Sequence, residues 1–419
     1  MDLSLLKMVI ADQREQYQAK FRSEKMVPRE NVACSPKTDL AVAITGPRRA
    51  GKSTFALLAV KDIPHAYINF DDERVNLKAE DLNQVVEAFY SLYPDAENWI
   101  FDEIQNVQGW ERFVSRIVQS KKVIITGSNS KLLSGELATS LTGRHLDARI
   151  FPFSFREYLK YLDYSPGAYT TRSVSTIKKH LEEYLARGGY PTAYKSDSGF
   201  YLALYSDILQ KDILARYRPK RPQELKDLAR LLLSNSGLEV SFNKLKIAFN
   251  IASANTVGKY VAYLEAAFLI FTVNRFSFKL KEQLLAPKKI YCIDTGLAAT
   301  IAPSTSTGKG RLMENLVAIE LSRRAAWKKD SQLCYWKDYS GHEVDFITLE
   351  GGKPKQAIQS CYDVSNPLTL EREIKSLRLG MKELRLKNGV VLTWDEEKKV
   401  KQPGSEILLI PLWKWLLEP

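Results

Sequence analysis

"AVAITGPRRAGKSTFALLAV", residues 41–60, is the stretch that decides the fold of this chain. It begins with apolar and β-branched residues, continues with a glycine-framed loop, and ends in an apolar run. The first part is typical of a buried parallel strand. The loop fits the pattern G-x-x-x-x-G-K-[ST], which follows a strand and opens a helix in phosphate-binding sites. We therefore expect an α/β domain with a parallel sheet, in which this loop joins a strand to a helix.

Each position of the loop has a chemical task in that pattern. Gly46 and Gly51 let the backbone turn its N–H groups toward phosphate, and the start of the next helix adds partial positive charge. Lys52 can reach the β- and γ-phosphates of a nucleotide, and the Ser53 hydroxyl can bind Mg²⁺. The predicted nucleotide-binding residues are Gly46, Pro47, Arg48, Arg49, Ala50, Gly51, Lys52, Ser53 and Thr54. For the two arginines, phosphate contact and exposure to solvent both stay open.

A second apolar stretch, "NWIFDEIQ" at residues 98–105, ends in two acidic residues. In open α/β sheets, ligands bind at the carboxyl ends of the strands, where Asp102 and Glu103 are expected. We predict that Asp102 holds a hydrated Mg²⁺ and that Glu103 polarises the attacking water. ATP and Mg²⁺ are therefore the expected cofactors.

A third predicted strand lies in "KKVIITGSNSKLL", residues 121–133, and ends in polar residues. Ser128 and Asn129 are placed to sense a γ-phosphate or to orient water, although such residues also form ordinary strand-end turns. Arg144 follows a Thr-Gly turn and is a candidate for stabilising transition-state charge in a neighbouring subunit. Arg149 and Arg156 are its rivals.

The bulk composition limits the class of protein. A chain of 419 residues predicts two or three domains, and its net charge of +12 moderately favours a polyanionic partner. The four cysteines are far apart in sequence, which argues against a zinc site and a disulfide framework. An early acidic residue argues against a signal peptide, and no apolar run is long enough for a membrane span. We therefore expect a cytoplasmic location and no membrane association.

Motifs along nearly the whole chain resemble a family of bacterial and archaeal AAA+-like ATPases that end in a DUF4143-type module. The motifs are "GPRRAGKS", "FDEIQNVQGWERF", "ITGSNSKLLSGELATSLTGR", "FPFSFREYL", "YLARGGYPTAY", "IDTGLAATI" and "GRLMENLVAIEL". The resemblance implies a P-loop ATPase domain at 1–160, a helical and winged-helix segment at 161–300, and a restriction-endonuclease-like domain at 301–419. It also gives Lys52, Ser53, Asp102 and Glu103 their usual ATPase roles. Arg144 is the best candidate for the arginine that acts in trans.

The middle segment holds two features that bear on DNA. The basic residues Arg216, Arg218, Lys220 and Arg221 surround two prolines, either as a phosphate-binding loop or as a solvated connector. Residues 241–276 have the pattern of a helix-turn-helix followed by a wing. The start of its second helix would present side chains to the major groove. The candidate DNA contacts are Ser253, Asn255, Thr256 and Lys259. Winged helices also bind proteins, so that alternative stays open.

The C-terminal stretch "GHEVDFITLEGGKPKQAIQSC", residues 341–361, reads as a strand pair of a nuclease-like module. The resemblance makes Glu314 and Asp345 equivalents of metal ligands and places Gln359 and Cys361 where a Glu-x-Lys pair is usual. A neutral amide and a soft thiol do not replace the hard anionic ligands that Mg²⁺ needs. Glu343 shares a strand face with Asp345, so a remodelled acidic site also stays open.

Three functions follow from these patterns. The first is an ATP-hydrolysing AAA+-type ATPase that binds or acts on DNA as a homo-oligomer. The second is a nucleotide-controlled switch that binds a protein partner. The third is an ATP-dependent, structure-specific nuclease, against which the residues at 359 and 361 argue.

Overall fold

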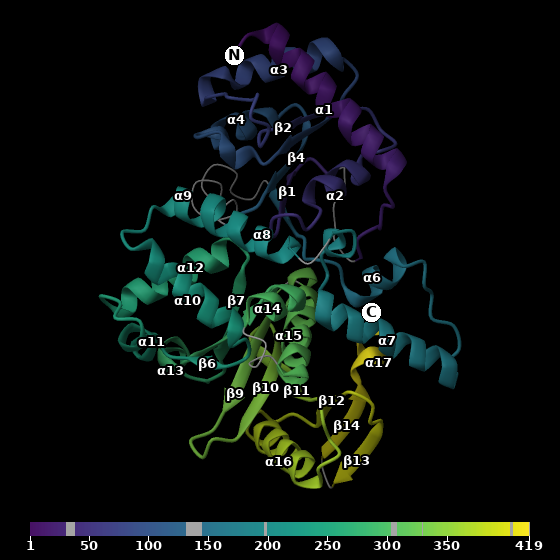
Figure 1. Ribbon diagram of the computed structural model, residues 1–419, viewed down its shortest axis with the longest axis vertical. Helices are drawn as coiled ribbons and strands as arrows, with labels where there is room; N and C mark the ends of the chain where they lie inside the picture. Colours follow the sequence, from purple (N-terminus) through teal and green to yellow (C-terminus); the bar gives the residue numbers. More distant parts are fainter. Residues whose placement is uncertain are drawn as a thin grey trace. The chain divides into compact units, whose positions relative to one another are not determined.

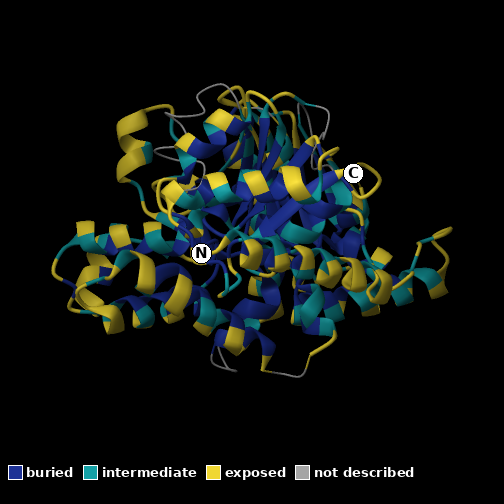
Figure 2. Cartoon of the chain, turned by 90° about the horizontal axis from the view of Figure 1, so that it is seen from above, coloured by how far each residue is buried: buried dark blue, intermediate teal, exposed yellow. Residues whose placement is uncertain are grey.

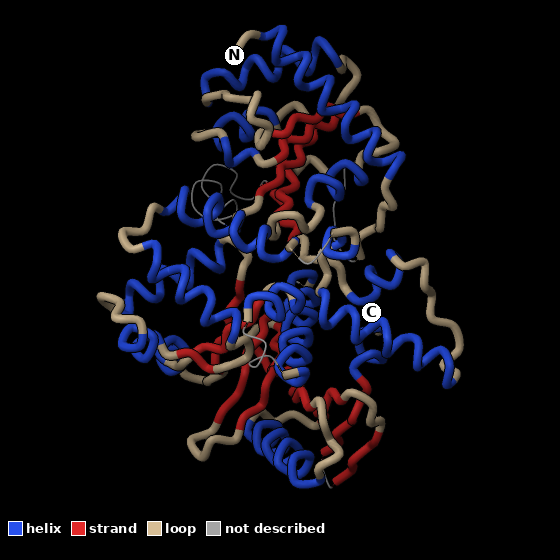
Figure 3. The backbone as a smooth tube through the Cα atoms, in the orientation of Figure 1, coloured by secondary structure: helices blue, strands red, loops and turns tan. Residues whose placement is uncertain are grey.

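The structure is a computed structural model of the chain. It describes residues 1–30, 38–130, 145–196, 199–302, 308–328, 330–402 and 405–418. The chain forms two compact units. The first holds Met1–Phe151 with Ala266–Phe268, and the second holds Pro152–Glu265 with Leu269–Pro419. Each unit has its own sheet, as the strands in Figure 3 show.

The sheet of the first unit has five parallel strands in the order β2-β3-β4-β1-β5. The strands are β1 (Ala41–Thr45), β2 (His65–Asn69), β3 (Asn98–Asp102), β4 (Lys122–Gly127) and β5 (His145–Arg149). Because β4 lies between β1 and β3, the loops after these three strands meet at one edge of the sheet. This confirms the predicted α/β class with a P-loop-type parallel sheet.

Helices cover this sheet and bury its apolar side chains (Figure 1). They are α1 (Leu3–Ser23), α2 (Lys52–Ala59), α3 (Leu82–Leu92) and α4 (Trp110–Ile117), with short 3₁₀ turns at Ala79–Asp81 and Ile104–Asn106. Asp2 caps α1 through a bond to the Ser4 N–H. The helix buries Leu6, Val9 and Ile10, whose i, i+3, i+4 spacing places them on one face. Figure 2 shows the buried residues on the strands and on inward helix faces.

The second unit begins with a helical region. Its helices up to residue 301 are α6 (Phe155–Tyr161), α7 (Thr171–Arg187), α8 (Phe200–Asp207), a π-helix (Ile208–Leu214), α9 (Ala215–Tyr217), α10 (Pro222–Ser234), α11 (Phe242–Ala248), α12 (Ala254–Ala266), α13 (Leu280–Leu285) and α14 (Thr295–Ile301), with a 3₁₀ turn at Pro191–Tyr194. Those that follow are α15 (Lys309–Trp327), α16 (Pro367–Glu383) and α17 (Leu412–Leu417). Among the residues that the structure describes, no helix is both long and apolar enough to cross a membrane.

A mixed nine-stranded sheet runs through the second unit in the order β13-β14-β12-β11-β10-β9-β7-β8-β6. Its strands are β6 (Glu239–Val240), β7 (Ile270–Arg275), β8 (Lys288–Cys292), β9 (Ser331–Lys337), β10 (Glu343–Glu350), β11 (Lys353–Cys361), β12 (Asn388–Thr393), β13 (Lys398–Gln402) and β14 (Ser405–Pro411). The parallel pair β7–β9 joins the strands on either side of residue 300. The three-part division at residues 160 and 300 stays a prediction.

Candidate functional site: the loop after β1 and the ends of β3 and β4

The loop between β1 and α2 has the backbone of a phosphate cradle. Gly46 has φ +151°, and a Cβ there would lie 2.1 Å from the Ile150 carbonyl oxygen, so no other residue fits. Arg49 and Gly51 are also left-handed, with φ 64° and 95°. Gly51 is the N-cap of α2, so the first N–H groups of that helix open onto the loop. The predicted loop residues therefore form one continuous turn at the start of a helix.

Lys52 is the first residue of α2, and its side chain is 4% exposed. Its ammonium donates to the Pro47 carbonyl oxygen at 3.2 Å and lies 3.3 Å from Oε1 of Glu103. Lys52 and Glu103 are 51 positions apart in sequence and follow β1 and β3, two strands that β4 separates in the sheet. The fold thus brings the loop lysine and the second acidic residue of β3 into contact.

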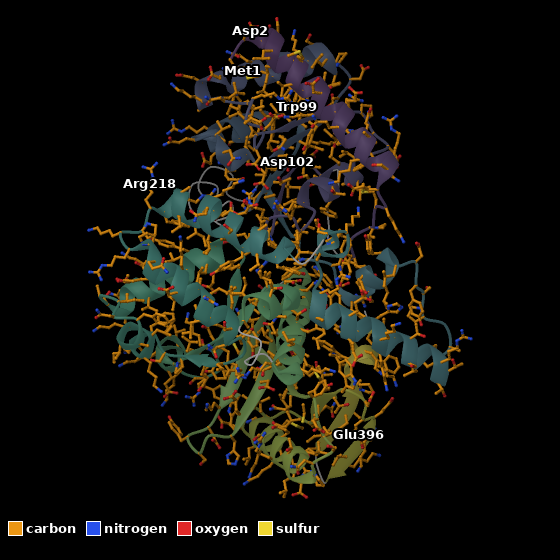
Figure 4. The ribbon with its side chains drawn as sticks, in the orientation of Figure 1. Met1, Asp2, Trp99, Asp102, Arg218 and Glu396 are labelled. Carbon is orange, nitrogen blue, oxygen red and sulfur yellow. The ribbon has the colours of Figure 1, made fainter. Side chains whose placement is uncertain are left out.

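Asp102 ends β3 and is buried (Figure 4). Its carboxylate accepts bonds from the Ser53 hydroxyl at 3.0 Å, from the Tyr67 hydroxyl at 2.8 Å and from the Thr126 hydroxyl. Burial raises the pKa of Asp102, and the nearby Glu103 carboxylate raises it further, while the three hydroxyl bonds oppose the shift. Because Ser53 and Asp102 offer hard oxygen donors 3.0 Å apart, this pair fits Mg²⁺.

Glu103 follows in the left-handed region, with φ 52°, which turns its side chain toward Lys52. Its N–H donates to the Thr126 hydroxyl at 3.0 Å, and its Oε2 accepts from the Ser128 N–H at 3.1 Å and from Gln105. Burial alone would raise the pKa of Glu103, but the Lys52 ammonium and the Gln105 bond outweigh it, so the pKa is lowered. The group is therefore a carboxylate that can accept a proton.

The other predicted site residues differ in their burial and in their contacts. Ser128 and Asn129 follow β4 and are 2% and 1% exposed. Arg48 lies 3.5 Å from Asp71, whereas Arg49 is exposed. Arg144 lies outside the described residues. Of its rivals, Arg149 places its guanidinium over the Phe151 ring at 4.9 Å, and Arg156, in the second unit, donates to the Glu418 carbonyl.

Three residues of the site are absent from the sequence prediction. Thr126 and Tyr67 both bind Asp102, and Arg29 donates to the Ala50 carbonyl at 3.2 Å within the loop. The only local signal for Thr126 is a polar residue in the apolar run "VIITG". Tyr67 has no local signal, because its role depends on β2 pairing with β3 in the register Tyr67↔Ile100.

The predicted DNA contacts lie in the second unit and divide into two pairs. The Ser253 hydroxyl accepts from the Thr256 N–H at 3.0 Å and also contacts the Thr256 hydroxyl, so these two side chains cap α12. Asn255 and Lys259 are exposed on the same helix. The stack of Tyr217 on Tyr263, with ring centroids 3.9 Å apart, holds the basic stretch at residues 216–221 against α12.

The basic stretch itself is exposed at all four of its charged residues, Arg216, Arg218, Lys220 and Arg221. Arg218 has φ 43° and its side chain points away from the helices (Figure 4). Arg221 contacts Glu224 at 2.7 Å, an exposed pair that contributes little stability. The exposed side of α12 and this stretch therefore form a cationic surface, which we call the α12 surface: Arg216, Arg218, Lys220, Arg221, Asn255 and Lys259.

Three protein-family models match consecutive stretches of the chain. The chain matches the AAA domain family at residues 38–159, the domain of unknown function DUF8612 at 178–307, and the domain of unknown function DUF4143 at 309–415. Among solved structures, the Orc1 protein of Aeropyrum pernix in complex with DNA is similar over 77% of this chain and 92% of that chain. Its identity is 12% and its TM-score is 0.29.

Two relatives that match most of the chain are more similar to it in sequence. An uncharacterized protein of Methanocaldococcus jannaschii is 36% identical over 89% of this chain and 87% of its own length. An uncharacterized protein of Haemophilus influenzae is 30% identical over 78% of this chain and 84% of its own length. The chain therefore belongs to the family of these two proteins, and it joins an AAA-type ATPase domain to a C-terminal DUF4143 domain.

Proposed function

We propose that the chain is a Mg²⁺-dependent ATPase that binds DNA and works as a homo-oligomer. The observation that carries the ATPase part is the meeting of the loop and the end of β3: Ser53 lies 3.0 Å from Asp102, and Lys52 lies 3.3 Å from Glu103. A P-loop hydroxyl and a strand-end carboxylate hold the metal in such sites, and a second carboxylate activates water.

In this proposal the residues of the chain divide the work. The loop N–H groups and Lys52 bind the phosphates, which requires Lys52 to exchange its Glu103 contact for phosphate oxygens. Ser53 and Asp102 hold Mg²⁺, which supplies charge neutralisation on the phosphates. Glu103, freed from Lys52, orients a water and takes its proton, while the Thr126 hydroxyl on the neighbouring strand donates to the Asp102 carboxylate and accepts from the Glu103 backbone N–H.

The ATPase part is tested by phosphate release from the full chain with Mg²⁺ and with EDTA. We expect turnover with Mg²⁺ only, and tight binding of a fluorescent ATP analogue that is lost in Lys52→Ala. Turnover that is equal in EDTA, or unchanged in Lys52→Ala, would refute this part. A concentration dependence of the specific rate tests the oligomer, because an arginine acting in trans, for which Arg144 is the candidate, needs a neighbour.

The DNA part is supported by the α12 surface and by the order of elements around it. The order along the chain is helix α10, strand β6, helices α11 and α12, strand β7, the short helix α13 and strand β8, and β8 pairs antiparallel with both β6 and β7. We interpret this order as a winged helix with α12 as the recognition helix. Its exposed Asn255 and Lys259 would contact bases and phosphates, and the arginines of the basic stretch would contact phosphates.

Fluorescence anisotropy with duplex, branched and single-stranded DNA at several salt concentrations tests this part. We expect binding that weakens steeply with salt, and ATP turnover that rises with the preferred DNA. Absence of salt-sensitive binding to all three DNA forms would refute it.

A second candidate, a nucleotide-controlled switch for a protein partner, is favoured by one observation. Four large apolar side chains on and next to α13 are exposed: Phe278 at 74%, Leu280 at 68%, Leu284 at 70% and Leu285 at 75%. Exposed apolar groups of this kind are typical of protein contact surfaces. If no DNA form changes the ATP turnover while Leu284→Lys changes it at unaltered self-association, the switch is the better function.

A further inference from the structure

A buried lysine stands at the centre of the acidic residues in the DUF4143 domain. Lys289 comes from β8, outside that domain, and its side chain is 3% exposed. Its ammonium lies 3.1 Å from Glu314 Oε1, 2.7 Å from Glu343 Oε1 and 2.9 Å from Asp345 Oδ1. Glu314 belongs to α15, and the other two acids belong to one face of β10. One cationic atom thus joins three structural elements.

We propose that Lys289 is the resident cation of the carboxylate cluster Glu314, Glu343 and Asp345, so that the cluster fastens β8 to α15 and β10 and does not take a divalent metal in the intact chain. The resemblance to nucleases implies a metal here, with Glu314 and Asp345 as ligands. The ammonium nitrogen instead contacts one oxygen of each acid. It occupies the point at which a shared ion would have to sit.

The three carboxylates also bond to groups other than Lys289. Asp345 Oδ2 accepts from the Ser360 N–H at 3.0 Å, which fixes the carboxylate against β11. Glu314 Oε1 accepts from the Tyr291 hydroxyl at 2.8 Å as well as from Lys289. Glu343 Oε2 lies 3.0 Å from Lys337, which in turn lies 2.6 Å from Glu239. The carboxylates are therefore oriented toward the two ammonium groups by hydrogen bonds.

The positions where a nuclease would have its Glu-x-Lys pair are occupied by the neutral side chains of Gln359 and Cys361. The Gln359 amide accepts from the Asp345 N–H at 3.2 Å and donates to Glu373 at 2.6 Å. Burial raises the pKa of the Cys361 thiol to about 11, so it stays protonated and is a poor ligand for a hard metal. Within the described residues, no group of three or more His, Cys, Asp or Glu side chains is arranged to hold a metal.

Electrostatics keep the lysine charged in this place. Burial on its own would lower the pKa of Lys289, but the surrounding Asp345, Glu314 and Glu343 carboxylates and Tyr291 outweigh burial and raise it well above the usual range. Burial and the Asp345 carboxylate raise the pKa of Glu314, since two acids share one corner of the cluster. The ammonium, 2.7 to 3.1 Å from an oxygen of each acid, is the counter-charge of the cluster.

The test is a titration of the nucleotide-free full chain with Mn²⁺, followed by electron paramagnetic resonance and by the melting temperature. The wild type, Lys289→Ala and the matched control Lys337→Ala are compared, each with Ser53→Ala to remove the ATPase metal ligand. Lys337 is a suitable control because it touches the same cluster through Glu343 alone. Without metal we expect Lys289→Ala to melt about 5–10 °C lower, since three carboxylates lose their cation.

With Mn²⁺ we expect Lys289→Ala alone to bind one ion at the cluster and to recover part of its lost melting temperature. Its oxygens converge on one point, and a contraction of less than about 1 Å brings them to metal–oxygen distances. Asp345→Asn added to Lys289→Ala should abolish this binding.

Two results overturn the proposal. The first is Mn²⁺ binding by the wild-type cluster that Asp345→Asn removes, which would show that the metal displaces Lys289. The second is a folded Lys289→Ala variant that neither melts lower nor binds Mn²⁺. If Lys289→Ala does not fold, the wild-type titration with Asp345→Asn decides alone, and absence of an Asp345-dependent signal supports the proposal.

Discussion

Lys52 and Lys289 are both buried lysines beside carboxylates, but their partners differ in number and kind. In the part of the chain that the structure describes, Lys52 contacts one carboxylate, Glu103 at 3.3 Å, and one backbone carbonyl. Lys289 meets three carboxylates at 2.7 to 3.1 Å. A lysine with one long ionic contact can exchange it for a phosphate oxygen at small cost. A lysine that neutralises three buried acids cannot leave without exposing them to one another.

The largest expected effect is on the free energy of unfolding, and it tests the difference between Lys289 and Lys52. Lys289→Ala should lower the free energy of unfolding by about 3–5 kcal/mol, because it leaves buried acids uncompensated. Lys52→Ala should lower it by about 1 kcal/mol or less, since Glu103 keeps its bonds from Ser128 and Gln105. Urea unfolding of the two variants measures both values. Equal losses would show that the two lysines have the same structural weight.

The second effect concerns the carboxylate that Lys52 releases. Glu103→Gln should reduce the turnover of ATP by about 10³-fold, or about 4 kcal/mol, because a general base is lost. Binding of ATP should persist, since Lys52 and the loop are unchanged. Stopped-flow binding and steady-state phosphate release separate the two quantities. Turnover within a factor of about three of the wild type would assign the base elsewhere.

The third effect concerns Thr126, whose hydroxyl lies between the Asp102 carboxylate and the Glu103 backbone. Thr126→Val keeps the shape of the side chain and removes its bonds to Asp102 and to the Glu103 N–H. We expect a loss of about 1–3 kcal/mol, seen as turnover reduced by roughly 5- to 150-fold. Thr126→Ser should restore most of the rate. A similar loss in both variants would point to packing instead of the hydroxyl.

The fourth effect depends on pH. The pKa of Asp102 is raised in the fold by burial and by Glu103, so its ionised form costs stability at every pH above the folded pKa. Asp102→Asn should therefore raise the stability of the nucleotide-free chain at pH 7, by roughly 0.5–2 kcal/mol, while abolishing Mg²⁺-dependent turnover. The gain should disappear as the pH falls below 3.8, where the acid is protonated in both states. Melting curves across pH test this sign.

The smallest effect concerns a lysine that is not buried at all. Lys259 is exposed on α12, and replacing it by alanine should leave stability within about 0.5 kcal/mol. It should reduce the slope of DNA affinity against salt by about one ion, if Lys259 contacts a phosphate. Ser253→Ala is the contrasting variant, because Ser253 caps α12 and its loss should affect the stability of the helix instead.

The sequence predicts the ATPase site better than the carboxylate cluster for a physical reason. The loop at 46–54 and the acids at 102 and 103 are local patterns, each complete within one strand and the turn that follows it. Thr126 and Tyr67 gain their roles only from strand order, because β4 and β2 lie on either side of β3. Local patterns do not contain strand order.

The role of Lys289 is harder to predict from the sequence. It lies 25 positions before Glu314 and 56 before Asp345, and it belongs to strand β8, which precedes the DUF4143 domain. Composition shows the acids of the C-terminal module, and the resemblance to nucleases suggests a metal for them. Only the β7–β8–β9 arrangement shows that a lysine from the preceding segment supplies their counter-charge.

The sheet that crosses residue 300 has a consequence for how this protein can be divided. Strand β7 lies beside β9 through Asn274 and Arg275, and Phe276 packs in the same core as Cys334 and Trp336. A chain cut at residue 300 would leave a newly opened strand edge on each fragment, the kind of edge that recruits other strands and aggregates. Recombination or cloning therefore cannot move the C-terminal module alone. Without strands β7 and β8 the module loses the strand that pairs with β9 and the lysine, Lys289, that supplies its cation.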